Sequence, residues 1–216
     1  SRSISKSIVS ACIDLAVQQK KIKHIDDPIF NYLPNYSKFK TVENEKITIR
    51  HLLSMSSGIE WNESVPHGTN INSETAMERS FDPIEYVLSQ KMEFLPRKIW
   101  VYNSGGVQVL AEIIKNSCGL EVDDFANQYL FLPLGITKFE WTKSSESSIF
   151  FNLDKIFSKR REFPASASGL RLTSRDLFKF GLLYLNNGKW NGKQILSENW
   201  VQESLKTQIL REENSP

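Results

Sequence analysis

Ser3 and Lys6 combine a hydroxyl with an amine three residues further along the chain. Apolar side chains recur at steps of three and four over residues 4–15, which predicts an amphipathic helix from about Ser3 to Gln19. Side chains three apart on a helix have Cβ atoms roughly 5–6 Å apart on one face, so this hydroxyl and amine could share a proton. Ser3 would also stand at the helix N-terminus, where free N–H groups and the helix dipole favour developing negative charge. The spacing therefore indicates a nucleophile with its base.

The same pattern occurs a second time, at Ser37 and Lys40. That copy follows Leu33 and Pro34 and has no apolar periodicity around it. A Ser-x-x-Lys match alone is therefore also compatible with a polar chain start, and both interpretations stay open on this pattern.

Composition excludes several classes of function. The chain has 216 residues, 40% of them hydrophobic, which is enough for the core of one domain. Its 27 basic and 25 acidic residues leave a net charge of +2, so nothing predicts a nucleic-acid or membrane-surface partner. Two cysteines are too few for a disulfide framework, and no Cys/His cluster has metal-ligand spacing. We expect no metal and no cofactor.

Targeting signals are not visible in this sequence. It has no run of 18 apolar residues and no secretory leader. Because the chain opens directly on the helix that carries Ser3 and Lys6, we expect that the sequence has been cut upstream. The missing leader therefore leaves the localisation open.

Further helices are predicted from caps and apolar periodicity, whereas almost no alternating strand pattern appears. Residues 35–46 and 60–80 are polar and are expected to be loops, the second of them long. Four helices are predicted to begin at the N-caps Thr48, Asp82, Thr173 and Ser197. A further helix is predicted from the apolar stripe at 107–114 and should end at Gly119, and another is predicted over residues 121–131.

Tyr102 and Ser104 stand just ahead of the helix predicted over 107–118. This Tyr-x-Ser sequence resembles the Tyr-x-Asn or Tyr-x-Ser motif of the serine β-lactamase and penicillin-binding-protein superfamily. The nearest group is that of class C β-lactamases, D-alanyl-D-alanine peptidases, related esterases and 6-aminohexanoate-dimer hydrolases. Segments 25–34, 47–58, 168–177 and 188–192 resemble the same group in the same order. Each motif is weak singly, but together they span residues 3–205 and make a specific match.

The resemblance implies an α+β fold of the β-lactamase/transpeptidase type. Most strands of the family's central antiparallel sheet would then lie outside residues 1–216, which would explain the helix-rich pattern. We expect one domain over 1–216, incomplete at both ends, with a helical lobe at about 48–140. The family's third motif, of Lys-Thr-Gly or His-x-Gly type, would lie beyond Pro216. A second departure is Pro96-Arg97, where the family usually has Pro-Gly.

The resemblance also implies chemistry. It predicts a serine hydrolase that cleaves an amide or ester, of the β-lactam, D-Ala-D-Ala peptide or small-ester class, through an acyl-enzyme on Ser3. Lys6 and Tyr102 would transfer protons. Lysine titrates near 10.4 in water, so a lysine base requires desolvation or a neighbouring cation. The Ser3 backbone N–H would be one oxyanion donor. Ser104 would bind Lys6 or the substrate amide.

Plainer interpretations stand beside these roles. Tyr102 could be a core residue, and Ser104 could only cap the helix that follows. Trp61 and Trp100 are candidates to line a substrate pocket, although large aromatic side chains are more often simply buried. His51 is interpreted as structural, because it sits inside a predicted helix.

The expected partner is a small-molecule or short-peptide substrate, and the chain is expected to be a monomer or homodimer. The resemblance alone favours an extracytoplasmic location, periplasmic or secreted. The alternative to catalysis is a silent relative that uses the same groove as a sensor or scaffold.

Overall fold

A computed structural model describes residues 2–143 and 162–210. The first helix, α1, runs from Ile4–Gln18 and confirms the prediction to within one residue at each end. Ser3 occupies its N-cap position with helical dihedral angles, φ −62° and ψ −8°, and its side chain makes no capping bond. The hydroxyl of Ser3 is therefore available for contacts outside the helix.

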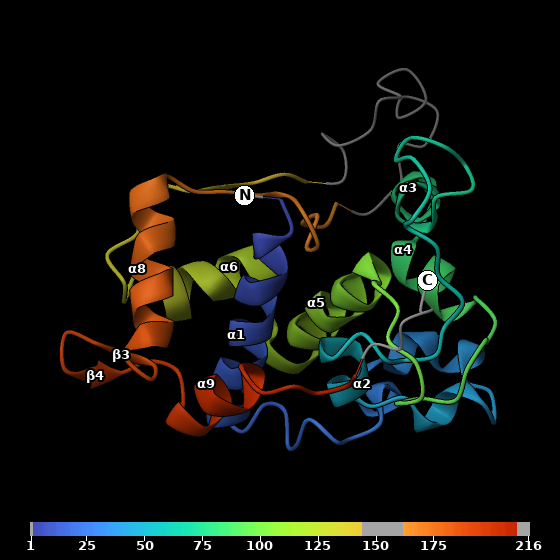
Figure 1. Cartoon of the computed structure of the whole chain (residues 1–216), viewed down its shortest axis with the longest axis horizontal. Coiled ribbons are helices and arrows are strands. Elements are labelled where there is room, and N and C mark those ends of the chain that lie inside the picture. Colours follow the sequence, from blue (N-terminus) through green and yellow to red (C-terminus); the bar gives the residue numbers. More distant parts are fainter. Residues whose placement is uncertain (1, 144–161, 211–216) are drawn as a thin grey trace.

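Helix α5, Ser104–Cys118, lies at the centre of the packing. It contacts α1, α2 (Ile49–Leu53), α4 (Pro83–Leu88) and α6 (Val122–Ala126), as Figure 1 shows from one side. Most of its residues are buried, and it ends at Gly119, whose φ of 75° is left-handed as the sequence predicts. Because α1 packs on α5, the start of each helix is fixed relative to the other.

All four predicted N-caps are confirmed. Thr48, Asp82, Thr173 and Ser197 each accept a backbone N–H in the first turn of α2, α4, α8 (Ser174–Leu185) and α9 (Glu198–Ser204). His51 completes a reciprocal cap on α2, because its Nδ1 accepts the backbone N–H of Thr48 at 3.1 Å. This contact agrees with the structural interpretation of His51.

Three loop or helix predictions need correction. Residues 60–80 are not loop throughout, because Asn72 caps a further helix, α3 (Ser73–Arg79). Residues 35–46, predicted as loop, contain the 3-10 turns η2 (Pro34–Phe39) and η3 (Asn44–Lys46), and a third 3-10 turn, η1 (Ile29–Tyr32), precedes them. The helix predicted over 121–131 is α6 followed by a π-helical turn, η4 (Asn127–Phe131).

Strands are few among the described residues. β1 (Glu140–Trp141) pairs antiparallel with β2 (Leu170–Arg171), and β3 (Lys189–Trp190) pairs with β4 (Lys193–Gln194). Asn191 and Gly192 join the last two with φ of 47° and 77°, both positive as in a type I′ hairpin turn. The Asn-Gly pair is a hairpin signal that the sequence analysis passed over.

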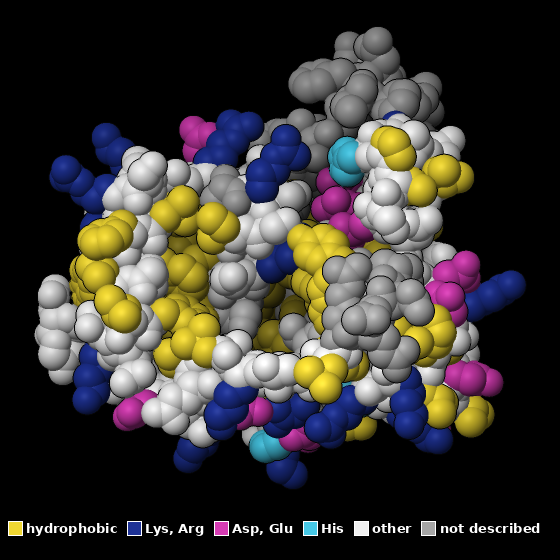
Figure 2. Space-filling model, in the orientation of Figure 1, with side chains coloured by type: hydrophobic (Ala, Val, Ile, Leu, Met, Phe, Trp, Pro, Cys, Tyr) yellow, Lys and Arg dark blue, Asp and Glu magenta, His cyan; other side chains and the backbone are white. Residues whose placement is uncertain are grey.

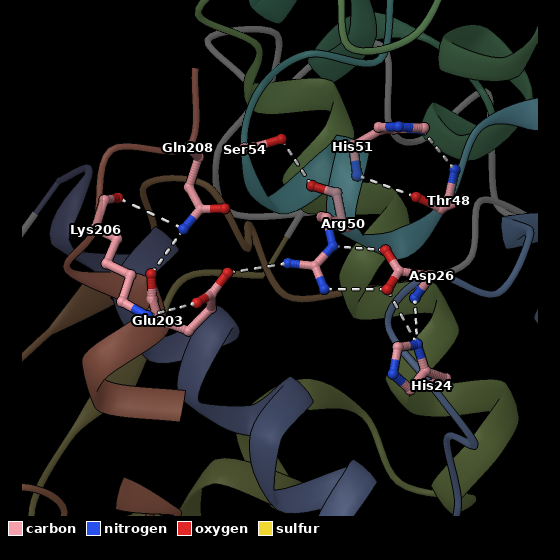
Figure 3. A network of polar contacts seen from close by, with 9 residues as sticks. All are labelled: His24, Asp26, Thr48, Arg50, His51, Ser54, Glu203, Lys206 and Gln208. Atoms are coloured by element: carbon pink, nitrogen blue, oxygen red, sulfur yellow. Dashed lines mark hydrogen bonds and ion pairs between the residues drawn. The ribbon is translucent and has the colours of Figure 1, made fainter. Parts of the chain in front are cut away.

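Arg50 ties three segments together (Figure 3). Its guanidinium donates to both carboxylate oxygens of Asp26, at 2.5 and 3.0 Å, and to Glu203 on α9 at 3.4 Å. The hydrogen bonds from Arg50 hold the pKa of Asp26 below its ordinary value. Helices α2 and α9 are joined through this one side chain.

Apolar side chains remain uncovered on the face shown in Figure 2, over and beside α8. Phe178 and Leu185 of that helix are mostly exposed. No helix within residues 2–143 and 162–210 is long and apolar enough to cross a bilayer.

Candidate active site

Ser3, Lys6 and Tyr102 converge. The Ser3 Oγ lies 2.7 Å from the Tyr102 hydroxyl, and the Lys6 Nζ donates to the same Oγ at 3.2 Å. The Lys6 Nζ also stands 5.0 Å from the centroid of the Tyr102 ring. The start of helix α1 supplies the hydroxyl and the amine, and the extended segment before α5 supplies the phenol. Ser3 itself is exposed, so the nucleophile candidate is open to solvent.

A main-chain carbonyl holds the lysine from its other side. The Lys6 Nζ donates to the carbonyl oxygen of Ala167 at 2.8 Å. The buried hydroxyl of Ser5 accepts the backbone N–H of Leu170 at 3.2 Å, which ties the same segment to α1. Sequence analysis missed Ala167, because a backbone carbonyl leaves no residue-type signal.

Gln108 of α5 positions the same segment. Its Nε2 donates to the carbonyl of Pro164 at 3.2 Å, and its Oε1 accepts the N–H of Ser166 at 3.1 Å. The segment from 164 to 170 is thus bound to α1 and to α5 at once. The amine of Lys6 therefore lies between the start of α1 and this segment, and both are held in place.

Ser104 lies beside this group but is fully buried, with 0% exposure. Its backbone N–H donates to Glu63 Oε1 at 2.7 Å and its hydroxyl donates to Glu63 Oε2 at 3.0 Å. The Ser104 hydroxyl thus donates to Glu63 rather than to Lys6, and the predicted hydrogen bond to a substrate amide stays a prediction. Ser104 is also not the cap of α5, because Asn103 accepts the Gly106 N–H. Sequence analysis missed Glu63, 41 residues away.

The two candidate tryptophans occupy different positions. Trp61 is 4% exposed, packs edge-to-face on Tyr86 at 6.2 Å between centroids, and donates its indole N–H to Glu63 at 2.5 Å. Trp100 is half-buried and lies tilted against Tyr102, with ring centroids 6.2 Å apart. Trp61 therefore contacts the Glu63 carboxylate from the protein interior, whereas Trp100 lies beside the phenol of Tyr102.

Arg97 occupies the position before the Tyr motif at which the resemblance leads us to expect glycine. Its φ is 69°, a left-handed conformation that glycine adopts without strain. Its backbone N–H donates to the carbonyl of Ser56 at 2.8 Å. The turn that leads to Tyr102 is therefore formed with an arginine in a glycine-like conformation.

No group of His, Cys, Asp and Glu that could hold a metal occurs within the described ranges. The convergent groups are instead a hydroxyl, an amine and a phenol, with the Ser3 hydroxyl within hydrogen-bond distance of both the Lys6 amine and the Tyr102 phenol. Such a set can move a proton from the hydroxyl and return it to a leaving group.

The fold and the three converging side chains define the class: the serine β-lactamase and penicillin-binding-protein superfamily, whose members are generally serine hydrolases. The chain belongs to the Beta-lactamase family, whose model matches residues 1–215.

Individual relatives are distant. The chain is 26% identical over 198 residues to an uncharacterized protein of Alkalihalophilus pseudofirmus, covering 90% of this chain and 50% of that protein. It is 26% identical over 147 residues to penicillin-binding protein 4* of Bacillus subtilis, covering 63% of this chain and 29% of that one. The chain thus spans half or less of these curated relatives.

Solved structures share the fold. A Bacillus anthracis protein provisionally named a 6-aminohexanoate-dimer hydrolase superposes with a TM-score of 0.72 at 21% identity, covering 94% of this chain and 51% of that one. A D-stereospecific amidohydrolase from Streptomyces gives a TM-score of 0.67 at 17% identity, covering 97% of this chain and 66% of that one. These likenesses confirm the predicted β-lactamase/transpeptidase-like fold.

Proposed function

We propose that the protein cleaves a small amide or ester through an acyl intermediate on Ser3. One observation carries the proposal: the Ser3 Oγ lies within hydrogen-bond distance of both the Tyr102 hydroxyl and the Lys6 amine, at 2.7 and 3.2 Å. A hydroxyl is a weak nucleophile until a neighbouring base takes its proton, and this arrangement supplies that neighbour.

In the acylation step, the Lys6 amine acts as the base and accepts the proton of the Ser3 hydroxyl. The Ser3 Oγ then forms a bond to the substrate carbonyl carbon, whose oxygen takes up the electron pair. We expect the Ser3 backbone N–H, which lies at the N-terminal end of α1, to stabilise that oxygen. Expulsion of the leaving amine or alcohol requires a proton, and the Tyr102 hydroxyl relays it from Lys6.

Deacylation uses the same proton transfers with water as the nucleophile. Water adds to the acyl carbon and passes a proton through Tyr102 to Lys6. The bond between the acyl carbon and Ser3 Oγ then breaks, Lys6 returns the proton to Oγ, and the carboxylic acid is released. The carbonyl of Ala167 keeps the Nζ of Lys6 in place through both half-reactions, because it accepts a hydrogen bond at 2.8 Å.

Relatives on this fold bear names of amide hydrolases and penicillin-binding proteins. The fold does not select among their substrates. We therefore propose the reaction type, an acyl transfer to Ser3, for a small amide or ester.

The direct test is covalent labelling of the full-length protein. A fluorophosphonate, a labelled β-lactam or a p-nitrophenyl ester should add one acyl or phosphonyl group to Ser3, detected by intact mass and peptide mapping. Ser3→Ala should abolish the adduct. Ser7→Ala, which removes an exposed hydroxyl one turn further along α1, is the matched control and should label normally. Full activity in Ser3→Ala would disprove the proposal.

The same experiment separates turnover from simple capture. Release of p-nitrophenol beyond one equivalent per chain shows that the acyl-enzyme is hydrolysed. An acyl-Ser3 adduct that forms but persists identifies the chain as a silent, sensor-type relative.

A further inference from the structure

The carboxylate of Glu63 meets the start of α5 at the residue that follows Tyr102 and Asn103. It accepts three hydrogen bonds: from the Ser104 N–H at 2.7 Å, from the Ser104 hydroxyl at 3.0 Å and from the Trp61 indole N–H at 2.5 Å. Hydrogen bonds to an ionised acceptor are stronger than neutral ones. Three donors from two residues leave this carboxylate little freedom to rotate.

The carboxylate of Glu63 also satisfies a free N–H at the start of α5. The first N–H groups of an α-helix have no partner within the helix, and the helix dipole favours negative charge there. Asn103 satisfies the Gly106 N–H and Glu63 satisfies the Ser104 N–H, so the two caps divide the first turn between them. After burial, the charge of Glu63 is the next cause that raises the pKa of the neighbouring Glu74.

Glu63 is itself braced from behind. Trp61 is buried and packs against Gly105 so closely that a Cβ added there would lie 2.5 Å from the indole ring. The edge-to-face contact with Tyr86 further restrains the ring. The indole N–H is thus a rigid donor, and it sets where the Glu63 carboxylate stands.

The consequence reaches Tyr102. Its hydroxyl must stay near 2.7 Å from the Ser3 Oγ, and its backbone is two residues from the N–H that Glu63 holds. Rotation of the peptide between Asn103 and Ser104 would swing the phenol away from α1. Glu63 opposes that rotation, because it binds both the backbone and the side chain of Ser104.

We propose that Glu63 is a positioning residue for the acyl transfer: it holds the start of α5 so that the Tyr102 hydroxyl remains against Ser3. The inference rests on the proposed function, since it concerns the same reaction. Glu63 acts through Ser104 and does not touch the reacting atoms. Its geometry, rather than its charge, is what the reaction requires.

The test compares Glu63→Ala, Glu63→Gln and Glu63→Asp in the full-length protein by the second-order rate of Ser3 labelling with a fluorophosphonate. Glu63→Ala and Glu63→Asp should label about 10–100-fold more slowly, because a displacement of about 1 Å in a reacting group costs on this order. Glu63→Gln keeps the length and an acceptor for the Ser104 N–H, so it should stay within about 5-fold of wild type by the same reasoning. Glu60→Ala, which removes an exposed carboxylate three residues earlier, is the matched control and should label at the wild-type rate.

Chemical rescue adds a readout that a purely structural loss would not move. Formate should restore part of the labelling rate of Glu63→Ala and leave wild type and Glu60→Ala unchanged at equal ionic strength. A wild-type rate in Glu63→Ala would overturn the inference, as would a rate kept by Asp but lost by Gln. If Glu63→Ala does not fold, the Gln and Asp variants decide. Absence of Ser3 labelling in wild type would instead disprove the proposed function.

Discussion

The phenolic oxygen of Tyr102 lies 2.7 Å from the hydroxyl of Ser3, although 99 residues separate them in the chain. The contact joins the exposed first turn of α1 to the extended segment before α5. Because α1 and α5 pack directly on one another, the distance is set by the helical core rather than by a flexible loop.

Tyr102→Phe should slow acylation of Ser3 by about 10²–10⁴-fold, the range for loss of a positioned proton-transfer group. The ring still packs on Trp100, so the melting temperature should change little. Burst kinetics with a p-nitrophenyl ester, followed beside thermal denaturation, measure both quantities. Wild-type burst rates in a folded Tyr102→Phe protein would remove Tyr102 from the mechanism.

Asp14→Ala should destabilise the protein by about 2–4 kcal/mol, because hydrogen bonds to charged groups and the donors left unpaired each contribute on this scale. Buried Asp14 accepts the N–H and hydroxyl of Ser197 at 2.7 and 2.8 Å, and the amide of Gln18 at 2.8 Å. The substitution removes the hydrogen bonds that join α1 to Ser197, the N-cap of α9. Urea unfolding measures the loss. Gln202→Ala, on the surface of α9, should shift stability by less than about 0.5 kcal/mol; equal effects of the two changes would contradict the assignment.

Arg50→Ala should cost more stability at neutral pH than in acid. Arg50 lowers the pKa of Asp26, so the folded pKa lies below the unfolded value near 3.9. The contribution is therefore present above that unfolded value and is lost as the pH falls through the folded pKa. The difference in urea midpoint between wild type and Arg50→Ala should therefore be smaller at about pH 2.5 than at pH 7.

Lys38→Ala is the control for the arginine experiment. It removes an exposed ion pair with Glu85, at 3.4 Å, and should change stability by less than about 1 kcal/mol at either pH. If the stability difference between wild type and Arg50→Ala stays constant across the same pH range, the ion pair with Asp26 does not make stability depend on pH.

Gly58→Ala should destabilise the protein more than Gly119→Ala. Both glycines are left-handed, with φ of 81° and 75°, so alanine costs about 1–2 kcal/mol at either position. At Gly58 the added Cβ would also lie 2.1 Å from the carbonyl oxygen of Phe94, whereas nothing lies within 4 Å at Gly119. Crowding should add about 1–3 kcal/mol at Gly58 alone, measured by denaturant titration. Equal losses would show that the chain relaxes around Gly58.

Arg97→Gly should stabilise the protein by up to about 1.6 kcal/mol. Relief of a left-handed side chain gains about 1–2 kcal/mol, and the greater freedom of glycine in the unfolded chain takes back about 0.4–1 kcal/mol. A rise in melting temperature without loss of Ser3 labelling would fit this expectation. A fall in stability would show that the Arg97 side chain makes contacts worth more than the strain.

Local chemistry made parts of this fold predictable. Thr48, Asp82, Thr173 and Ser197 cap helices because a short polar side chain ahead of an apolar stripe satisfies a free N–H, and this needs no distant partner. The 3.6-residue period likewise located α1, and with it the spacing of the Ser-x-x-Lys pair.

The remaining parts depended on partners distant in sequence. Glu63 binds Ser104 across 41 residues, and the carbonyl of Ala167 binds Lys6 across 161. Neither contact leaves a periodic or residue-type signal. Helix α3 was missed for a related reason: it is short and polar, and its formation depends on the Asn72 cap and on packing against α4 and α5.

The acceptor on Ala167 has a consequence for variation at this site. Since it belongs to the peptide backbone, every amino acid at position 167 carries the same oxygen, and no single codon change there deletes it. Ala167 is buried, however, so a larger side chain would keep this oxygen but would displace the neighbouring residues. Substitutions meant to weaken the hydrogen bond to Lys6 without crowding position 167 must target Gln108 or Ser5, whose side chains bind the segment from 164 to 170.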